Sequence, residues 1–401
     1  MNIVIIGGSF GGLNVAYNLR RLLPDKSHNI TVISKDPRFV FIPSLPWVAM
    51  GSKTIDNISF DLERPLNSKS IDFIEAAVER IDPNTSQVHT ATATVDYDFL
   101  VVATGHRSAN EAVPGLGPFD GPAHSLMSAP EAEEVRDSWA AFLEKPGPMV
   151  IGCAPGASCL GPAYEFLFEA HHALKQRKLC HKAPMTFITP EPFLGHFGVG
   201  GFGKIRQYLE AELESRDVRY HTSAAITKIT GESVETADGS VFNSTFSLII
   251  PPLAGVKAVA EAPGLGNPKG FIPVDEYYRH KDFNNIYAVG VAVALPPVED
   301  TPVPVNFPKT GHMTEQMAGI AARNIAADIL GTEKTTHELM AECIMDMGDE
   351  GAHIVADPVR PPRNVSRLSS GRRWLWAKRF FAEYYLWMLR RGSNRSPKWV
   401  W

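Results

Sequence analysis

Short apolar runs, separated by glycine-rich turns and amphipathic stretches, recur along the chain. Residues 3–6 form the first run, followed by the glycine-rich segment 7–12, a helical stretch over 13–23 and a second apolar run at 30–33. A continuous apolar run of this length predicts a strand buried on both faces, as in a parallel sheet. Strand, turn, helix and strand in this order predict a βαβ unit.

A second unit of the same kind begins at residues 149–152, where glycines again precede a helical stretch. Further apolar runs at 99–103, 185–188, 246–250 and 286–289 predict more strands. We therefore predict an α/β fold with two Rossmann-like dinucleotide-binding domains and a C-terminal amphipathic region that associates with membranes. The expected bounds are 1–112 with 275–325 for a discontinuous first domain, 113–274 for the second domain and 326–401 for the C-terminal region.

The first glycine-rich segment has the residue types that bind a dinucleotide pyrophosphate. Gly7 permits a tight turn, and Gly11 and Gly12 allow close packing, so that the next helix can offer free N–H groups to phosphate. Ser9 stands where a full motif has glycine, and a glycine-rich turn without a ligand is the alternative. The candidate cofactor residues here are Gly7, Gly8, Ser9, Phe10, Gly11 and Gly12, with Ser34 and Lys35 after the second strand.

Two later strands resemble the flavin-contact segments of flavoproteins with two dinucleotide-binding domains. Residues 97–105 end in Ala-Thr-Gly, and residues 285–290 end in Gly. The resemblance implies FAD as the cofactor, with Val291 standing where many of these proteins have Asp. It adds these candidates for cofactor binding: Ala77, Val78, Thr104, Gly105, Gly290, Val291 and Gly311.

The second glycine-rich loop departs from a pyridine-nucleotide site. Residues 152–159 read Gly-Cys-Ala-Pro-Gly-Ala-Ser-Cys. Pro155 removes a donor N–H and fixes φ, and Cys159 stands where the helix is expected to begin. We therefore expect this domain to keep the fold without binding NAD(P)H.

Four cysteines, Cys153, Cys159, Cys180 and Cys343, are too few for a secreted disulfide framework. None belongs to a Cys-x-x-Cys pair, so we expect no zinc site and no metal. Inert buried thiols are one interpretation of this pattern. The other is a Cys159 thiol whose pKa is lowered by the helix N-terminus. The segment around Cys343 is expected to be helical.

The C-terminal segment is basic and aromatic. Residues 360–401 carry eleven Lys and Arg and one acid, so this segment contributes +10 and the preceding residues −15 to the net charge of −5. Arg372, Arg379, Glu383 and Arg390 recur at helical spacing beside a broad aromatic face, and Trp399 and Trp401 follow. This pattern favours a helix that lies in the membrane interface, with basic side chains toward anionic lipid.

Other interpretations of this segment are a helix packed on the body, a homo-oligomer interface and an RNA-binding tail. The acidic body argues against nucleic acid. No stretch reaches the length of a membrane span, and no secretory signal precedes the first strand. We expect a peripheral membrane protein at the cytoplasmic face of the cell membrane.

Several segments together are similar to sulfide:quinone oxidoreductase, in the flavin disulfide reductase superfamily. They are the cysteine contexts 156–166 and 342–349, the segments 291–299 and 304–313, and 376–386 of the tail. The resemblance implies an enzyme that oxidises hydrogen sulfide to polysulfide or zero-valent sulfur and passes electrons through FAD to quinone. Cys159 and Cys343 match the redox pair, Lys309 a cation near the flavin, and His196 a residue that handles protons.

A membrane quinone is the expected electron acceptor, since the second glycine-rich loop disfavours NAD. The candidates for its slot are Ile344, Phe380, Phe381 and Tyr384. The chain also departs from the family pattern: Met127 stands where many members have a third cysteine, and Glu131 replaces a histidine. Met cannot bond to flavin or bridge sulfur, so we expect non-covalent FAD and a mechanism with two cysteines.

Three alternatives stay open at this point. A flavocytochrome c sulfide dehydrogenase flavoprotein has the same cysteine pair, but is normally exported. A type II NADH:quinone oxidoreductase has the same fold, but the loop with Pro155 and Cys159 opposes it. An FAD-stabilised membrane scaffold or sulfide sensor without catalysis is the third.

Overall fold

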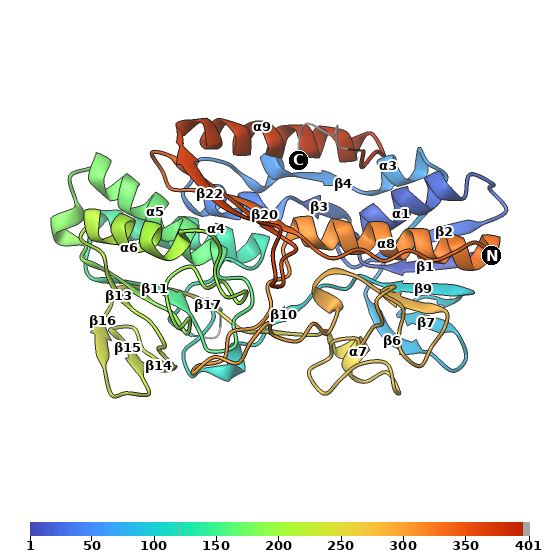
Figure 1. Ribbon diagram of the computed structural model, residues 1–401, viewed down its shortest axis with the longest axis horizontal. Helices are drawn as coiled ribbons and strands as arrows, with labels where there is room; N and C mark the ends of the chain where they lie inside the picture. The colour runs from blue at the N-terminus through green and yellow to red at the C-terminus, as the bar shows by residue number, and fades with distance from the viewer. Residues whose placement is uncertain (120, 396–401) are drawn as a thin grey trace.

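A computed structural model describes residues 1–119 and 121–395 of the chain (Figure 1). A five-stranded parallel sheet forms the first layer, and the order of its strands places the N-terminal strand at the centre. In spatial order the strands are β19 (Ile286–Ala288), β9 (Phe99–Val102), β1 (Asn2–Ile6), β2 (Asn29–Ser34) and β5 (Asp72–Glu75). The strands at 3–6, 30–33, 99–103 and 286–289 are confirmed within one residue at each end.

Two helices that are distant in sequence pack together beside this sheet: α1 (Phe10–Leu22) and α8 (Gly311–Leu330). α1 begins at Phe10, three residues earlier than predicted, because the glycine segment itself supplies its first turn. Smaller elements surround this layer: β3 (Arg38–Val40), α2 (Leu45–Ala49), β4 (Ser59–Asp61), α3 (Glu63–Asn67), β6 (Val78–Asp82), β7 (Gln87–Thr90) and β8 (Thr94–Asp96).

A four-stranded parallel sheet forms the second layer. Its order is β13 (Arg219–His221), β12 (Met185–Ile188), β11 (Met149–Cys153) and β17 (Phe246–Ile250). Its helices are α4 (Ala129–Glu144), α5 (Gly161–Gln176) and α6 (Ile205–Ser215). The remaining elements near this sheet are β10 (Arg107–Ser108), β14 (Ile226–Ile229), β15 (Ser233–Thr236), β16 (Val241–Asn243) and β18 (Leu253–Ala254). The short helix α7 (Lys257–Ala260) packs instead against β6 (Figure 1). The fold is thus α/β, with two parallel sheets of the Rossmann type.

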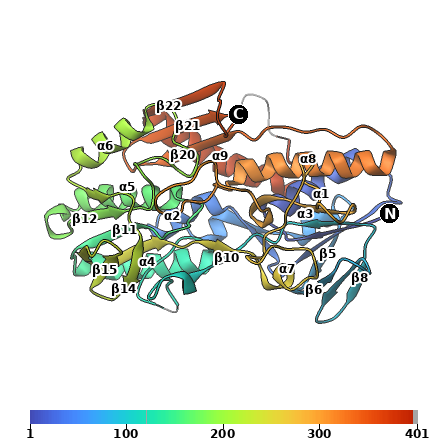
Figure 2. The same ribbon diagram turned by 60° about the horizontal axis from the view of Figure 1, so that its bottom comes forward.

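The C-terminal part is an antiparallel sheet followed by a helix. β20 (Ala341–Asp346), β21 (Gly351–Asp357) and β22 (Val365–Gly371) lead into α9 (Arg372–Arg390). Figure 2 shows this sheet beside α5, with α9 continuing toward α1. The predicted tail helix is confirmed. The helix predicted around Cys343 is wrong, because that segment pairs along its whole length with the buried strand β21 and forms β20 instead.

Candidate redox active site

The turn after β1 brings backbone atoms so close together that no side chain fits. A Cβ on Gly7, whose φ is +112°, would lie 2.2 Å from the carbonyl oxygen of Ala103. A Cβ on Gly12 would lie 1.8 Å from the carbonyl oxygen of Gly7. Only glycine is accommodated at both positions, which is the close strand–helix packing that a dinucleotide-binding turn requires.

The N-terminus of α1 faces outward from this turn. Its N-cap residue Ser9 is exposed and makes no capping hydrogen bond through its side chain, which leaves backbone N–H groups of the first turn available to an anion. Ser34 ends β2, but its hydroxyl donates to the carbonyl of Asp36 at 2.9 Å, while Lys35 is exposed. Ala77 and Val78 follow β5, at the same edge of the sheet.

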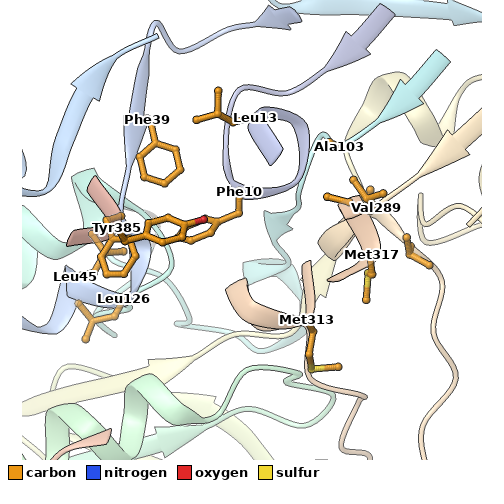
Figure 3. Close-up of a cluster of buried hydrophobic side chains, with 14 of the residues drawn as sticks. Phe10, Leu13, Phe39, Leu45, Ala103, Leu126, Val289, Met313, Met317 and Tyr385 are labelled. Carbon is orange, nitrogen blue, oxygen red and sulfur yellow. The ribbon is translucent and has the colours of Figure 1, made fainter. Parts of the chain in front are cut away.

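The three predicted flavin segments meet at the start of α1. A Cβ on Gly11 would lie 3.0 Å from Val289, and 3.4 Å from both Ala103 and Thr314. Figure 3 shows Phe10, Ala103 and Val289 around this point, with Met313 and Met317 of α8 beside them. The segment 103–105 after β9, the segment 289–291 after β19 and the N-termini of two helices therefore converge.

The first residues of α8 complete this convergence. A Cβ on Gly311, the first residue of α8, would lie 3.2 Å from the Phe10 ring. Gly105 and Gly290 have φ values of +70° and +69°, and nothing lies within 4 Å of a Cβ built on Gly105. A slim glycine turn, free helix N-termini and open backbone after β9 are the donor set and space that FAD needs, so these residues fit that cofactor.

Lys309 brings a cation to this region. Its ammonium donates to the carbonyl of Val291 at 3.0 Å and lies 4.0 Å from the centroid of the Phe271 ring. Burial lowers the pKa of Lys309 to about 8. Burial, and then the charge of Lys309, lower the pKa of His106 to about 4, so this histidine is neutral. Sequence reasoning missed His106, which follows directly after the Ala-Thr-Gly segment.

The two candidate redox cysteines come from different parts of the fold. Cys159 lies two residues before α5, and Cys343 lies on β20. Both are free thiols, and the charge of Cys343 contributes to the raised pKa of Cys159. Cys343 is exposed, whereas Cys159 is half-buried.

The lowered thiol pKa expected at the helix N-terminus is wrong. Burial raises the pKa of Cys159 to about 12, and the charge of Cys343 raises it further. Burial also raises the pKa of Cys343 to about 11, which Lys378 opposes. Cys159 precedes the helix rather than starting it, and loss of solvation outweighs the helix dipole.

A buried cluster of charges lies beside Cys343, and sequence reasoning missed its role. The Lys378 ammonium donates to Glu165, and the Trp47 indole N–H donates to Asp346 at 3.0 Å. Lys378 is only 7% exposed, although its place among exposed arginines suggested a lipid-facing cation. One signal was present in the sequence: Glu165 and Glu169 interrupt an otherwise apolar run at a spacing of four residues.

Desolvation and charge compete within this cluster. Burial raises the pKa of Glu165 to about 7, and Lys378 opposes that rise. Burial also raises the pKa of Glu169, with the charge of Glu165 adding to it. For Lys378, burial lowers the pKa, but the attraction of Glu165 and Glu169 outweighs this and the net shift is upward.

His196 is held by two contacts within the protein. Its Nδ1 accepts a hydrogen bond from the backbone N–H of Gly198 at 3.1 Å, and its Nε2 lies 2.8 Å from a carboxylate oxygen of Glu299. The ring is buried. Both nitrogens are therefore engaged by the chain itself, and a role for His196 in proton transfer stays a prediction.

The second dinucleotide-type turn is closed by the chain's own side chains. Glu191 follows β12, where a pyridine-nucleotide enzyme places the acid that binds ribose. Its carboxylate is fully buried and accepts hydrogen bonds from the Tyr164 hydroxyl at 2.6 Å, the Thr189 hydroxyl at 2.8 Å and the Phe197 N–H at 2.7 Å. These internal donors occupy the acceptors that a ribose would need.

The candidate quinone residues fall into two groups. Ile344 and Phe381 are half-buried, and the Phe381 ring lies 6.2 Å from that of Phe41. Phe380 is 56% exposed and stacks on Tyr384 at 6.1 Å, in an outward row with the exposed Trp376 and Trp387. Trp399 and Trp401 lie outside the described residues. Within residues 1–119 and 121–395, no helix is long and apolar enough to cross a membrane.

The position of the third family cysteine is occupied as the sequence indicated. Met127 is half-buried, and its backbone N–H donates to the side chain of Glu131 at 2.6 Å. Glu131 thus holds the backbone at the start of α4. It provides a carboxylate there, where the family pattern has the imidazole ring of a histidine. Met127 and Glu131 are paired with each other in the structure.

The comparisons with known proteins agree with this arrangement. A family profile described as pyridine nucleotide-disulphide oxidoreductase matches residues 1–155. The sulfide-quinone reductase of Aquifex aeolicus (strain VF5) is 38% identical over 400 residues, which cover 98% of this chain and 92% of that protein. The X-ray structure of the sulfide:quinone oxidoreductase from the same species superposes with a TM-score of 0.95, covering 99% of this chain and 93% of that one.

A more distant relative is the type II NADH:quinone oxidoreductase of Staphylococcus aureus, which is 24% identical over 349 residues and 83% of each chain. Of these two relatives, the Aquifex aeolicus protein has the higher identity to this chain, and the match covers nearly the whole length. It includes the segments that carry both redox cysteines, 156–166 and 342–349. The chain belongs to the sulfide:quinone oxidoreductase family.

Proposed function

We propose that this protein oxidises hydrogen sulfide and passes the electrons through FAD to a membrane quinone. The observation that supports it most directly is that the charge of one free thiol, Cys343, acts on the other, Cys159, with Lys378 of the buried Lys378–Glu165 ion pair acting on Cys343. Two free thiols from distant parts of the chain, one of them near a cation, would form a dithiol–disulfide couple suited to exchange with hydrosulfide.

The thiol chemistry follows from these residues. With the pair oxidised, hydrosulfide attacks the Cys159–Cys343 disulfide, which leaves one persulfide and one thiolate. Lys378 stabilises the thiolate when it forms at Cys343, because its positive charge lowers the pKa of that group. FAD would supply the two-electron acceptor when it is bound, and loss of an electron pair would oxidise the persulfide and the thiolate to a sulfur-bridged state.

Glu165 and Lys309 have distinct tasks in this proposal. Glu165 has a pKa near 7, so it can take up the proton that hydrogen sulfide releases and give it back near neutral pH. Lys309, with Gly311 at the N-terminus of α8, places positive charge on the flavin side. That charge favours the anionic reduced cofactor, and the slim glycine turn at 7–12 holds its pyrophosphate.

The internal hydrogen bonds of Glu191 support sulfide rather than NAD(P)H as the electron donor. A type II NADH:quinone oxidoreductase would need that acid free for a ribose, whereas Tyr164, Thr189 and Phe197 occupy it. Pro155 in the preceding loop provides no N–H for a pyrophosphate. The second sheet therefore serves to present Cys159.

The outer face of α9 supports docking on a membrane surface. Trp376, Phe380 and Trp387 are 69%, 56% and 50% exposed along one helix, beside several arginines. Aromatic side chains of this kind lie at headgroup depth in interfacial helices. Quinone then enters from the lipid past Phe381 and Ile344, and we place the protein at the cytoplasmic face of the membrane.

Met127 supports a mechanism with two cysteines and non-covalent FAD. Neither its thioether nor Glu131 can hold a sulfur chain or bond to flavin. Sulfur therefore accumulates on Cys159 and Cys343 alone, and leaves as polysulfide or zero-valent sulfur.

Anaerobic titration of the FAD-bound protein tests the proposal. Sulfide should bleach the flavin absorbance with two electrons per sulfide, decyl quinone should restore it, and NADH should leave it unchanged. A flavin reduced by NADH but not by sulfide would assign the chain to NADH oxidation. Reoxidation by a cytochrome c but not by quinone would favour a flavocytochrome-type partner.

A further inference from the structure

A basic cavity lies beside the C-terminal end of α9. It has a volume of about 340 Å³ and is lined by Tyr17, Arg20, Arg21, Lys69 and residues 392–395. Four of the lining residues are cations: Arg20 and Arg21 from the end of α1, Lys69 from the turn after α3, and Arg395 from the C-terminal segment. Positive charge from three separate elements therefore converges on one cavity.

The walls of this cavity are built by fixed contacts. The Tyr17 hydroxyl donates to the carbonyl of Leu389 at 3.1 Å, and the Asn394 amide donates to the side-chain oxygen of Asn14 at 2.9 Å. Arg20 donates to four backbone carbonyls, among them those of His28 at 3.0 Å and Ser70 at 2.8 Å. These bonds engage the two terminal nitrogens of its guanidinium, but among the described residues its buried Nε has no hydrogen-bond partner and its charge has no bonded carboxylate.

The same cations lack anionic partners in the part of the chain that the structure describes. No salt bridge joins Arg20, Arg21, Lys69 or Arg395 to a carboxylate there, although Asp72 acts on Arg20 at longer range. Burial, and then the charges of Arg395 and Arg323, lower the pKa of Arg21. The like charges therefore repel one another, which an anion in the cavity would relieve.

A favourable interaction with the helix dipole of α1 does not account for all four cations that line the cavity. Basic residues in the last turn of a helix interact favourably with its C-terminal carbonyls, which explains Arg20 and Arg21. It does not explain why Lys69 and Arg395 arrive from other elements. The flavin turn is at the opposite end of α1, roughly 18 Å away for a helix of 13 residues.

The position of the cavity indicates the chemistry of its ligand. The exposed Trp387 on the outer face of α9 lies one turn before the cavity, and the Arg391 guanidinium stacks 4.2 Å from its ring. The cavity thus opens beside the aromatic face that we place at headgroup depth. Phosphate esters of lipids lie at this depth and carry one negative charge or more.

We propose that this cavity binds the phosphate group of an anionic lipid headgroup, with Lys69 and Arg395 as the residues that distinguish anionic from neutral lipid. The inference rests on the proposed membrane docking of α9. A soluble phosphate ester has the same chemistry, so the experiment separates the two sources. The cavity volume accommodates a glycerophosphate headgroup.

The test uses the FAD-bound protein, calorimetric titration and two soluble probes, dihexanoyl phosphatidylglycerol below its micelle concentration and inorganic phosphate. The pocket variant is Lys69→Gln with Arg395→Gln. The matched control is Arg372→Gln with Arg373→Gln, which removes two exposed charges from the other end of α9. We expect saturable binding of the short-chain lipid by the wild type and the control, and a loss of at least about tenfold in the pocket variant.

The relative affinities of the three proteins for the two probes decide whether the proposal holds. Tighter binding of the lipid than of phosphate assigns the cavity to a lipid headgroup, and equal binding assigns it to phosphate esters in general. No saturable binding by the wild type, or equal losses in both variants, would overturn the proposal. Because both probes are soluble, the result is independent of vesicle binding, which separately tests the docking of α9.

Discussion

The thiolate of Cys343, one of the two candidate redox thiols, is stabilised by a neighbouring charge rather than by a helix end. Burial raises the pKa of both, to about 12 for Cys159 and about 11 for Cys343. A thiolate there is unfavourable unless a cation compensates it. Lys378 is that cation, and Glu165 holds it in place. We therefore treat Cys159, Cys343, Lys378 and Glu165 as one functional group of residues, rather than the two cysteines alone.

Lys378→Met should destabilise the protein by about 3 kcal/mol, because it leaves the carboxylate of Glu165 buried without its partner. Glu165→Gln combined with Lys378→Met should cost less than the two single changes added together, by at least about 1 kcal/mol. Urea unfolding followed by tryptophan fluorescence measures all four proteins of this cycle. Strictly additive effects would show that Lys378 and Glu165 do not act as a pair.

Gly105→Ala should weaken FAD binding by about tenfold or more, because it adds a methyl group to the open backbone after β9 where the flavin is expected. Gly331→Ala is a matched control, since Gly331 has nearly the same φ, +67° against +70°, and also has nothing within 4 Å of its Cβ. Both changes should cost about 1 kcal/mol of stability through backbone strain. Equal FAD affinities in the two variants would remove Gly105 from the cofactor site.

At the scale of the element, α9 has two faces with different tasks. Its inner face carries the buried Lys378, Tyr385 and Leu389, which contact the redox cluster and the start of α1. Its outer face carries the exposed Trp376, Phe380 and Trp387. One helix therefore joins the expected membrane surface to the thiol site.

Replacing Trp376, Phe380 and Trp387 together with Ser should abolish most binding to phosphatidylcholine vesicles, because these side chains supply the exposed apolar area of α9. The control triple, Phe119, Tyr220 and Val241 to Ser, removes exposed apolar side chains from the second domain. Vesicle flotation of the FAD-bound proteins measures the difference. Equal loss in both triples would show that α9 is not the docking face.

The sequence predicted most strands of the two parallel sheets closely but missed the edge strands β5 and β13, and physical reasons explain where it failed. Strands such as β11 and β17 are buried on both faces, so their apolar runs are continuous and bounded by glycine or proline. β20 has no such run: its residues read Ala-Glu-Cys-Ile-Met-Asp. Its strand conformation depends on pairing with β21, which a local pattern does not reveal.

The candidate site was predictable only in part, for a similar reason. The glycine turn and the two later flavin segments are local motifs, and the structure brings them together. The partner of Lys378 lies 213 positions away in the sequence, so the inward direction of that lysine could not be predicted. The raised thiol pKa values depend on burial, which arises only when β20 packs beside α5.

At the scale of the whole molecule, each sheet contributes one component of the proposed redox site. The first sheet presents the flavin turn, the second presents Cys159, and the C-terminal sheet presents Cys343. The turn of the second sheet, which other members of this fold use for NAD, is instead closed by Glu191 and its internal donors.

Because the buried acid Glu191 closes that turn, we predict that the free energy of unfolding depends on pH. Burial raises the pKa of Glu191 from 4.5 to about 7. At low pH the carboxyl is neutral in both states, and as the pH rises the unfolded chain ionises first, so the folded state loses stability through pH 7. The free energy of unfolding of the wild type, relative to Glu191→Gln, should fall by about 3 kcal/mol between roughly pH 4 and pH 8. A difference independent of pH would contradict the raised pKa.

The central claim is that Cys159 and Cys343 together transfer the electrons of sulfide to FAD. Anaerobic stopped-flow bleaching of the flavin by sulfide, in Cys343→Ser and in the control Cys180→Ser, tests it most directly, since Cys180 is also a free, half-buried thiol. We expect Cys343→Ser to retain FAD and lose sulfide-driven bleaching, while Cys180→Ser is bleached at the wild-type rate. Bleaching of the Cys343→Ser flavin at that same rate would contradict the account.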